Sequence, residues 1–355
     1  MSLSAPRAAK RLRLTSARTP WTCTECVRRS FVTSQRGGLL QQQTPQPRSQ
    51  RPSPTPSSSR NNGTTHFGFE TVDETAKESR VGAVFSSVAS SYDVMNDFMS
   101  LGIHRLWKDH FVRSLDPGMK RTPTTSSEFN AASPARPQRI LDIAGGSGDI
   151  ALRMLDHATR IHGDTASHVT ISDINPDMLA EGRKRLSQTP YHAQGRVDYL
   201  EANAEDLSAI ESNSIDLYTV AFGIRNFTHK DRALREAFRV LRPGGVFACL
   251  EFAPQLSNSL LNAVYKRWSF SAIPLIGQIV ASDRDSYQYL VESIERFPSQ
   301  PEWARMISEA GFLIPGDVGG EVGSGGRSPG QTPMQHGWED LSLGIAAIHK
   351  GVKPV

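Results

Sequence analysis

A glycine-rich loop that follows an apolar segment is the part of this sequence best suited to hold a small molecule. Residues 141–149 read Leu-Asp-Ile-Ala-Gly-Gly-Ser-Gly-Asp. Glycines lack a side chain, so the backbone can approach a ligand closely, and the start of the following helix presents free N–H groups to it. A second apolar segment ends at Asp173, and an acid at such a position can bind ribose hydroxyls. We therefore expect a nucleoside-containing ligand here.

Two classes of ligand suit a loop of this kind, and the first is a nicotinamide dinucleotide. Gly146, Gly148 and Ala151 satisfy the GxGxx(G/A) pattern, and Asp173 follows at a tolerable distance. An NAD(P)-dependent oxidoreductase is therefore one hypothesis, although this loop pattern alone has low specificity.

The second class is S-adenosylmethionine, which is favoured by further polar residues. Asp142 lies inside the end of the first strand, where it can meet a cationic amino group, whereas Asp149 would repel a pyrophosphate at the start of the helix. Asn203 and Ala204 follow the third strand, where an amide can read an adenine edge. The expected binding residues are Asp142, Gly146, Ser147, Gly148, Asp173, Ile174, Asn203 and Ala204.

The elements that must position these residues follow from the hydrophobic pattern after Arg139. Apolar segments alternate with segments of helical periodicity, which predicts a parallel sheet with helices on both faces. The expected strands are 139–144, 168–173, 197–202, 215–222 and 245–252, with two more near 312–315 and 341–349. The expected helices are 148–160, 176–187 and 229–241, and Asn175 is expected to cap the second of them.

The sequence before the sheet and the breaks within it divide the chain further. Apolar residues recur every three or four positions over 81–99, which predicts an amphipathic helix that covers the ligand. One proline- and threonine-rich segment lacks any periodicity, and another contains eight glycines, so both are expected to be flexible. The expected parts are a leader (1–65), a helical lid (66–116), a flexible insertion (117–138) and a core (139–355) with a glycine-rich insertion (316–337).

The first 60 residues have the composition of a transit peptide. They contain eleven Lys or Arg residues and ten Ser residues but a single acidic residue, Glu25. The whole chain carries a formal charge of +4, yet removal of this segment leaves 29 basic and 35 acidic residues. The basic balance therefore belongs to the leader, and a nucleic-acid partner is not indicated. We expect a protein of the mitochondrial matrix.

Cysteine content and hydropathy argue against several other classes. Three cysteines are too few for a disulfide framework, and the lone pair Cys23 and Cys26 is weak evidence for zinc, so no metal site is expected. No apolar run approaches the roughly 18 residues that are needed to span a bilayer.

Several separated segments resemble the C-methyltransferases of ubiquinone and menaquinone biosynthesis. Residues 92–107 read YDVMNDFMSLGIHRLW and agree with that family's YDxMNxxxSxxxHxxW signature. Residues 222–226 read FGIRN, close to the family's FGLRN, and residues 239–251 contain RVLRPGG and LE, close to RVLKPGG…LE. The resemblance covers roughly residues 80–350 apart from the two insertions, and the order of the motifs makes chance a poor explanation.

The resemblance implies a fold, a reaction and catalytic residues. The fold is the α/β, Rossmann-like class I methyltransferase fold, with a seven-stranded sheet, helices on both faces and an N-terminal helical lid. The reaction transfers a methyl group from S-adenosyl-L-methionine to a ring carbon of 2-methoxy-6-polyprenyl-1,4-benzoquinol in ubiquinone (coenzyme Q) biosynthesis. Because a neutral ring carbon is a poor nucleophile, a fixed cation beside the substrate hydroxyl would help.

Three residues are the expected catalytic groups. Arg225 follows the fourth strand and is expected to stabilise charge and orient the substrate, while Asn226 orients the hydroxyl or a water that relays its proton. Tyr92 belongs to the signature on the lid. The structural alternatives are an ion pair for Arg225 and simple packing for Tyr92.

Partners and a third hypothesis complete the expectations. The prenylated benzoquinol implies peripheral contact with the matrix face of the inner membrane, and apolar residues within 260–280 suit such contact or a homodimer face. The resemblance also implies membership of a multi-subunit coenzyme Q synthesis complex. A catalytically silent scaffold of that assembly is the third hypothesis, and the intact Asp142, Asp173 and Arg225 argue against it.

Overall fold

The computed structural model describes residues 63–88, 102–118, 136–254, 284–314 and 337–355, with isolated residues between 96 and 100 and between 256 and 278. All of these belong to one unit, Ser58–Val355. The expectations for Tyr92, for the leader before residue 63 and for most of the two insertions and the 260–280 segment lie outside the described residues.

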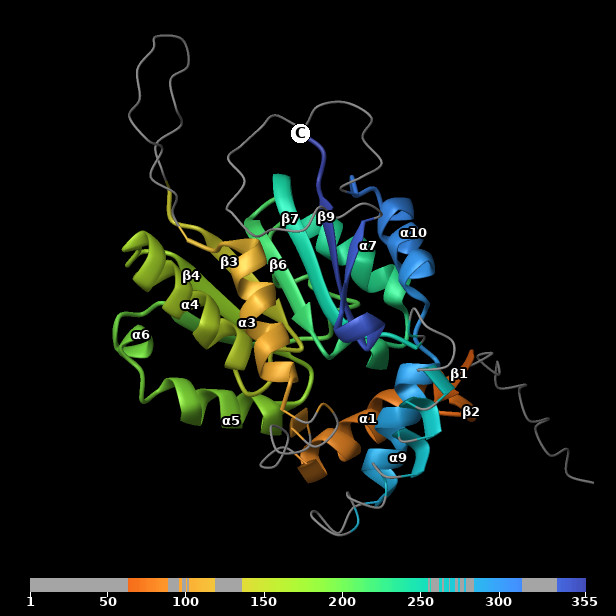
Figure 1. Cartoon of the computed structure of the whole chain (residues 1–355). Helices are drawn as coiled ribbons and strands as arrows, with labels where there is room; N and C mark the ends of the chain where they lie inside the picture. Colours follow the sequence, from red (N-terminus) through yellow and green to blue (C-terminus); the bar gives the residue numbers. More distant parts are fainter. Residues whose placement is uncertain are drawn as a thin grey trace, which may run out of the picture. The chain divides into compact units, whose positions relative to one another are not determined.

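A seven-stranded sheet forms the centre of this unit (Figure 1). Its spatial order is β5-β4-β3-β6-β7-β9-β8, in which the first five strands are parallel and β9 is antiparallel to both of its neighbours. The sheet has seven strands, as expected, although not all of them lie where they were predicted, and it is mixed rather than wholly parallel. The strands are β3 (Arg139–Ile143), β4 (His168–Asp173), β5 (Val197–Glu201), β6 (Ile215–Ala221), β7 (Leu241–Phe252), β8 (Trp338–Leu341) and β9 (Ala346–Val352).

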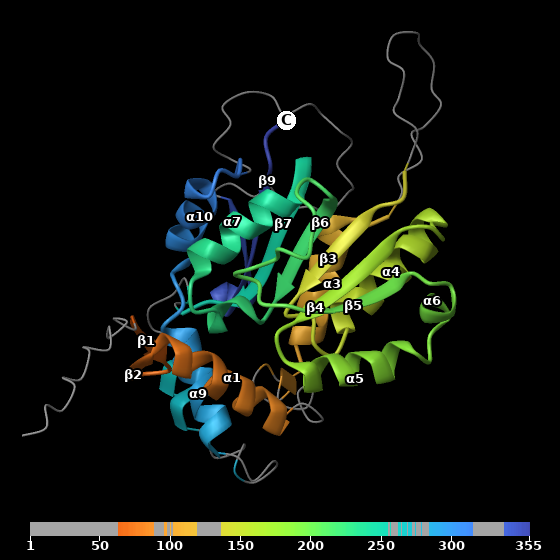
Figure 2. The same cartoon turned by 180° about the vertical axis from the view of Figure 1, so that it is seen from behind.

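Helices cover both faces of the sheet, as the alternating pattern predicts (Figures 1 and 2). Because successive strand side chains point to opposite faces, Ile140 packs in the core on one side and Leu141 in the core on the other. The first core includes side chains of α3 (His104–Leu115), α4 (Asp149–His162) and α5 (Pro176–Leu186). The second includes side chains of α7 (Lys230–Val240) and α10 (Gln300–Glu309). A single turn of helix, α6 (Pro190–Ala193), precedes β5.

The order of the strands creates a ligand site. The chain runs outward from β3 through β4 to β5 and then returns to β6 on the other side of β3. In open α/β sheets, ligands bind beyond the carboxyl ends of the strands where the strand order reverses in this way. The ends of β3 and β6 therefore mark the place to search.

The N-terminal part forms a cover at that end of the sheet. It begins with an unexpected hairpin, β1 (Thr64–Phe67) and β2 (Glu70–Asp73). The predicted leader, residues 1–65, therefore overlaps the first two residues of β1. The helix α1 (Glu74–Val88) follows, so it begins seven residues before the predicted position, and residues 89–95 lie outside the description. Figure 1 shows α1 across the end of the sheet beside α9 (Arg284–Glu295).

Two predictions near the C-terminus are wrong. Around 312–315 there is only an isolated bridge between Leu313 and Val352 instead of a strand. The single strand predicted over 341–349 is two strands, β8 and β9, separated by the 3₁₀ turn η3 (Ser342–Gly344). The turn is made by Ser342 and Leu343, both with positive φ, a conformation that these residue types rarely adopt and that composition therefore did not indicate.

None of the helices among the described residues combines the length and the apolar character required to cross a bilayer.

Candidate active site

A cavity of about 350 Å³ opens at the carboxyl ends of β3, β4 and β6, where the strand order reverses. Its walls come from the sheet edge, the glycine loop and α1. It brings together seven of the eight expected binding residues and one expected catalytic residue: Asp142, Gly146, Ser147, Asp173, Ile174, Asn203, Ala204 and Asn226. Gly148 and Arg225 are not among the described residues that line it.

The glycine loop has a shape that side chains would prevent. Gly146 has a φ of +41°, and a Cβ built on it would lie 2.6 Å from Cε of Met178. Gly148 has a φ of +73°, and its Cβ would lie 2.3 Å from Leu186. This glycine therefore lets the loop pack against the end of α5, and it does not form part of the cavity wall. Gly182 of α5 was not predicted: its Cβ would lie 2.4 Å from the carbonyl oxygen of Gly146. The loop motif gives no sign of Gly182, because Gly182 and Gly146 are far apart in the sequence.

Asp142 is the carboxylate best prepared for a cation. Its side chain is 1% exposed, and Oδ1 accepts a hydrogen bond of 2.7 Å from the Thr219 hydroxyl. Oδ2 has no hydrogen-bond partner among the described residues. Burial raises the pKa of Asp142 to about 7, and the nearby carboxylates of Asp149 and Asp173 add to this effect. A cationic group in the cavity would complete the bonding of Oδ2 and favour the ionised form.

Asp173 connects the glycine loop to the start of α5. Its Oδ2 accepts from the Gly146 N–H at 3.0 Å and its Oδ1 from the Asn175 N–H at 2.9 Å. Burial raises the pKa of Asp173 to about 6, although these backbone donors oppose the shift. Asn175 caps α5 as predicted, because its Oδ1 accepts from the N–H groups of Asp177 and Met178. Each Asp173 oxygen keeps a lone pair with which it can accept a ribose hydroxyl.

Asn203 follows β5, as expected for the residue that reads an adenine edge. Its Oδ1 accepts from the N–H of Glu205 at 2.9 Å, so the turn uses the carbonyl of this side chain. The amide nitrogen is the part that remains to donate to a ligand in the cavity, where Asn203 and Ala204 form one wall.

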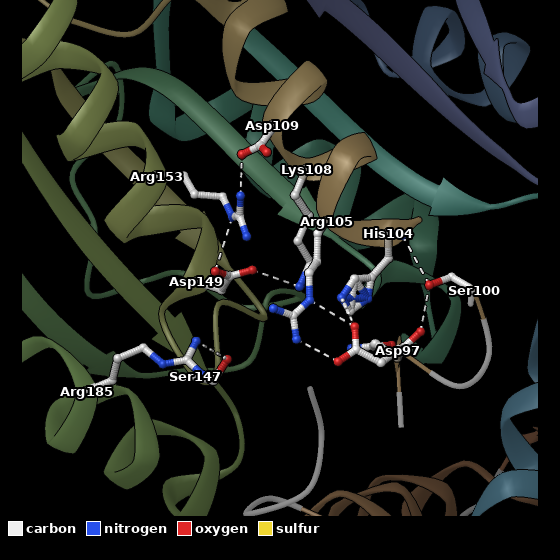
Figure 3. A network of polar contacts seen from close by, with 11 residues as sticks. Asp97, Ser100, His104, Arg105, Lys108, Asp109, Ser147, Asp149, Arg153 and Arg185 are labelled. Atoms are coloured by element: carbon white, nitrogen blue, oxygen red, sulfur yellow. Dashed lines mark hydrogen bonds and ion pairs between the residues drawn. The ribbon is translucent and has the colours of Figure 1, made fainter. Parts of the chain in front are cut away.

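The charge of Asp149 is balanced by the lid, which the sequence reasoning missed (Figure 3). Lys108 of α3, 4% exposed, lies 2.9 Å from Asp149 Oδ2, and Arg153 lies 3.1 Å from Oδ1 while it also binds Asp109. Burial raises the pKa of Asp149, but the two cations outweigh it and bring the net value below the usual range. The expected repulsion of a pyrophosphate by Asp149 is therefore largely cancelled, and that argument against a dinucleotide fails.

Arg225 lies at the expected edge of the sheet but pairs inside the protein. Its Nη1 contacts Glu251 Oε1 at 2.8 Å and the Phe222 carbonyl at 2.5 Å, and both charged side chains are no more than 1% exposed. The partner Glu251 is the penultimate residue of β7. This geometry matches the structural alternative, an ion pair, and does not support direct contact of the guanidinium with a ligand in the cavity.

Asn226 is the member of the same 3₁₀ turn, η2 (Ile224–Asn226), that reaches the cavity. Its Oδ1 accepts a hydrogen bond of 3.0 Å from the hydroxyl of Tyr289 in α9, which leaves the amide N–H groups as donors. The Tyr289 ring stacks on Phe67 with a centroid separation of 4.3 Å. Neither Tyr289 nor Phe67 was predicted, because each contributes through contacts between segments that are distant in the sequence.

The cover over the cavity is held by polar contacts at the start and in the middle of α1. Glu74, at the start of α1, lies 3.3 Å from His229 next to α7. Further along, Asn175 Nδ2 donates to the Gly82 carbonyl at 3.0 Å. Val81 and Phe85 of α1 line the cavity with apolar groups, so these two residues of the predicted stripe face the ligand space.

Comparisons with known proteins point to one family of methyltransferases. A profile of the ubiE/COQ5 methyltransferase family matches residues 73–316. The chain is 50% identical over 289 residues to "2-methoxy-6-polyprenyl-1,4-benzoquinol methylase, mitochondrial" of Schizosaccharomyces pombe, with 81% of this chain and 84% of that protein covered. It is 46% identical over 290 residues to the protein of the same name in Caenorhabditis elegans, with 82% and 85% covered. It is 48% identical over 287 residues to "Ubiquinone/menaquinone biosynthesis C-methyltransferase UbiE" of Bartonella tribocorum, with 81% and 93% covered.

Proposed function

The chain belongs to the ubiE/COQ5 methyltransferase family and is an S-adenosylmethionine-dependent methyltransferase, and we propose that it methylates a ring carbon of 2-methoxy-6-polyprenyl-1,4-benzoquinol in ubiquinone biosynthesis. The observation that carries the proposal is the shared cavity. It combines Asp142 and Asp173 at the sheet edge with Asn226 and the apolar residues of α1 opposite them.

The sheet edge would hold the methyl donor. We assign Asp142 Oδ2 to its ammonium group, Asp173 to its ribose hydroxyls and the amide of Asn203 to its adenine edge. When bound, the donor supplies an electrophilic methyl group on a sulfonium. Gly146 and Gly182 let the loop and α5 approach each other closely enough to form the floor of this part of the cavity.

The other half of the cavity would hold the quinol ring. Methyl transfer forms a bond from the ring carbon to the methyl carbon as the sulfur–methyl bond breaks, and the sulfur keeps the electron pair of that bond as a neutral thioether. The ring then loses the proton of that carbon to water. Electron density at this carbon rises as the neighbouring hydroxyl ionises, and a phenol has a pKa near 10. We assign the Asn226 amide to donate to that oxygen, because a hydrogen bond to the ionised form favours it.

Arg225 then has an indirect role in this proposal. Its pairing with Glu251 and the Phe222 carbonyl fixes η2, and η2 carries Asn226 to the cavity. We therefore assign Arg225 as a positioning residue and Asn226 as the residue that touches the substrate.

The location of the enzyme follows from its substrate. The basic, acid-poor leader and the mitochondrial relatives support import into the mitochondrion. A polyprenyl tail resides in a bilayer, so we propose peripheral association with the matrix face of the inner membrane. A homodimer and assembly with other enzymes of coenzyme Q synthesis are further parts of this proposal.

Methyl transfer to a short-chain analogue tests the proposed function. The protein would be incubated with methyl-labelled S-adenosylmethionine and a short-chain methoxy-benzoquinol, and the labelled position would be located by nuclear magnetic resonance. We expect the label on a ring carbon. Label on an oxygen would change the reaction class, and saturable binding of a nicotinamide dinucleotide without binding of the methyl donor would support the oxidoreductase instead.

Variants of the turn test the assignment of Asn226. We expect Asn226→Ala to lower kcat by about a hundredfold with the donor affinity unchanged, since one donor aimed at developing charge has an effect of that order. Tyr289→Phe, which removes only the hydroxyl that holds Asn226, is the matched variant and should lower kcat by less.

A further inference from the structure

Two histidines and an aspartate converge at the end of the lid that is remote from the cavity. Nε2 of His157 lies 2.9 Å and Nε2 of His162 lies 2.7 Å from the same Asp116 carboxylate oxygen. The three ligand atoms all lie within 4.8 Å of one another, and each of the side chains is partly buried. None of these residues belongs to the motifs or to the proposed reaction.

The fold brings these groups together from two helices. Asp116 ends α3 in the left-handed conformation, with a φ of 49°, while His157 and His162 lie in the last two turns of α4. Gly118 packs against the ring of His162, since a Cβ at this position would lie 3.1 Å from Cδ2. The cluster therefore depends on the relative position of α3 and α4.

From this arrangement we infer that Asp116, His157 and His162 form a binding site for a divalent transition metal ion of the zinc type. Two imidazoles and a carboxylate are the ligands that zinc prefers. Zinc bonds of about 2.0–2.1 Å in tetrahedral geometry place the ligand atoms roughly 3.3 Å apart. The two distances from the Asp116 oxygen, 2.9 and 2.7 Å, are somewhat shorter than this, and all three ligand atoms lie within 4.8 Å of one another. The side chains are 35%, 12% and 18% exposed, so a water molecule can occupy the fourth position.

The ion at this site would have a structural rather than a catalytic role. Asp149, which opens α4 beside the cavity, precedes His157 by eight residues and His162 by thirteen. At 1.5 Å per residue the ligands lie about 12 and 20 Å further along the helix, too far to touch a reacting group. A metal ion here would instead join the end of α3, which supplies Lys108 to the cavity, to the end of α4.

Metal titration of the full chain tests this inference. We expect one equivalent of Zn²⁺ to bind, and to raise the thermal unfolding midpoint, in calorimetry and thermal denaturation after treatment with a chelator. His162→Ala should weaken this binding at least about tenfold, since even residues that only support a metal ligand have effects of that size. His66→Ala, at an exposed histidine of β1, is the matched control and should bind Zn²⁺ like the wild type.

Two further measurements keep the test specific. Asp116→Asn removes the charge but tolerates the left-handed conformation, so we expect an unchanged fold by circular dichroism together with weakened binding. Co²⁺ should give a spectrum without thiolate-to-metal bands, which excludes the Cys23 and Cys26 pair as the site. Absence of Zn²⁺ binding, or equal binding by His162→Ala and the wild type, would show that the cluster is only a set of hydrogen bonds and would overturn the inference.

Discussion

At the residue scale, two buried carboxylates set the conditions under which the cavity binds its ligand. Burial raises the pKa of Asp142 to about 7 and that of Asp173 to about 6. Between about pH 4 and pH 7 the folded protein therefore holds protons that the unfolded chain has released, so stability without ligand falls as the pH rises through this range. The ionised form of these carboxylates lowers the stability of the protein without ligand, but it is also the form that binds a cationic donor.

Donor affinity should depend on pH in the opposite sense to stability. Below about pH 7 the ammonium group must displace a proton from Asp142, so we expect the affinity for S-adenosylmethionine to fall by up to about tenfold per pH unit. Calorimetry in buffers of different ionisation enthalpy measures both the affinity and the released proton. In Asp142→Asn, which keeps an acceptor for Thr219, the affinity should be lower and the dependence should move to the region of Asp173, about pH 6. A pH-independent affinity in the wild type would contradict this role.

The ion pair behind the cavity has a separable contribution to stability. Arg225→Met leaves the buried Glu251 without its cation, and we expect a loss of about 3–5 kcal/mol in the free energy of unfolding, measured with urea. The double variant Arg225→Met with Glu251→Gln should recover most of that loss, because no uncompensated charge remains. If the double variant is stable and binds the donor yet transfers no methyl group, Arg225 takes part in the reaction directly and the positioning assignment fails.

At the element scale, the approach of α5 to the glycine loop determines the floor of the cavity. We expect Gly182→Ala to lower donor affinity at least about tenfold, because its Cβ would lie 2.4 Å from the carbonyl oxygen of Gly146 and must displace helix or loop. Lys184→Ala is the control, since Lys184 lies in the same helix with an exposed side chain and does not line the cavity. This control should bind the donor normally. Equal effects of the two substitutions on affinity would contradict the close-approach argument.

The sequence predicted the elements around this loop well, for a physical reason. β3, β4 and β5 each lie within one residue of the expected bounds. The central strand β3 is a nearly continuous run of buried residues, whereas β5 is a partly buried edge strand that was delimited by its place in the alternation of strands and helices. The turn between β8 and β9 was missed because Ser342 and Leu343 adopt positive φ there, and the single glycine of the turn, Gly344, did not by itself mark a break in the sequence. Arg225 was placed at the correct edge, but sequence spacing does not tell whether a side chain there turns toward the cavity or toward Glu251.

At the scale of the whole unit, the N-terminal residues complete a cavity that the sheet alone leaves open. Lys108 of α3 neutralises Asp149, Phe67 of β1 supports Tyr289, and α1 supplies Val81 and Phe85. The part predicted as a lid thus contributes charge and orientation as well as cover. Exclusion of water strengthens each of these electrostatic contacts around the reacting groups.

Hydrogen exchange should reveal how this cover responds to the methyl donor. The cavity face of α1 borders the ligand space, and polar contacts from Asn175 and His229 hold the helix, so we expect its amides to exchange readily without donor and more slowly with it. The amides of α10, whose Trp303 and Ile307 are fully buried on the other face of the sheet, should not change.

A variant of Asn175, whose side chain holds α1 over the cavity, makes this expectation specific. Asn175→Ser retains a side-chain oxygen that caps α5 but lacks the amide that donates to the Gly82 carbonyl and to Ser86 Oγ. Exchange in α1 should become faster in this variant while α5 remains protected, and the donor should bind more weakly because part of its binding energy closes the cover. If the donor protects α10 as much as α1, or if Asn175→Ser leaves α1 exchange unchanged, the cover does not close through this contact.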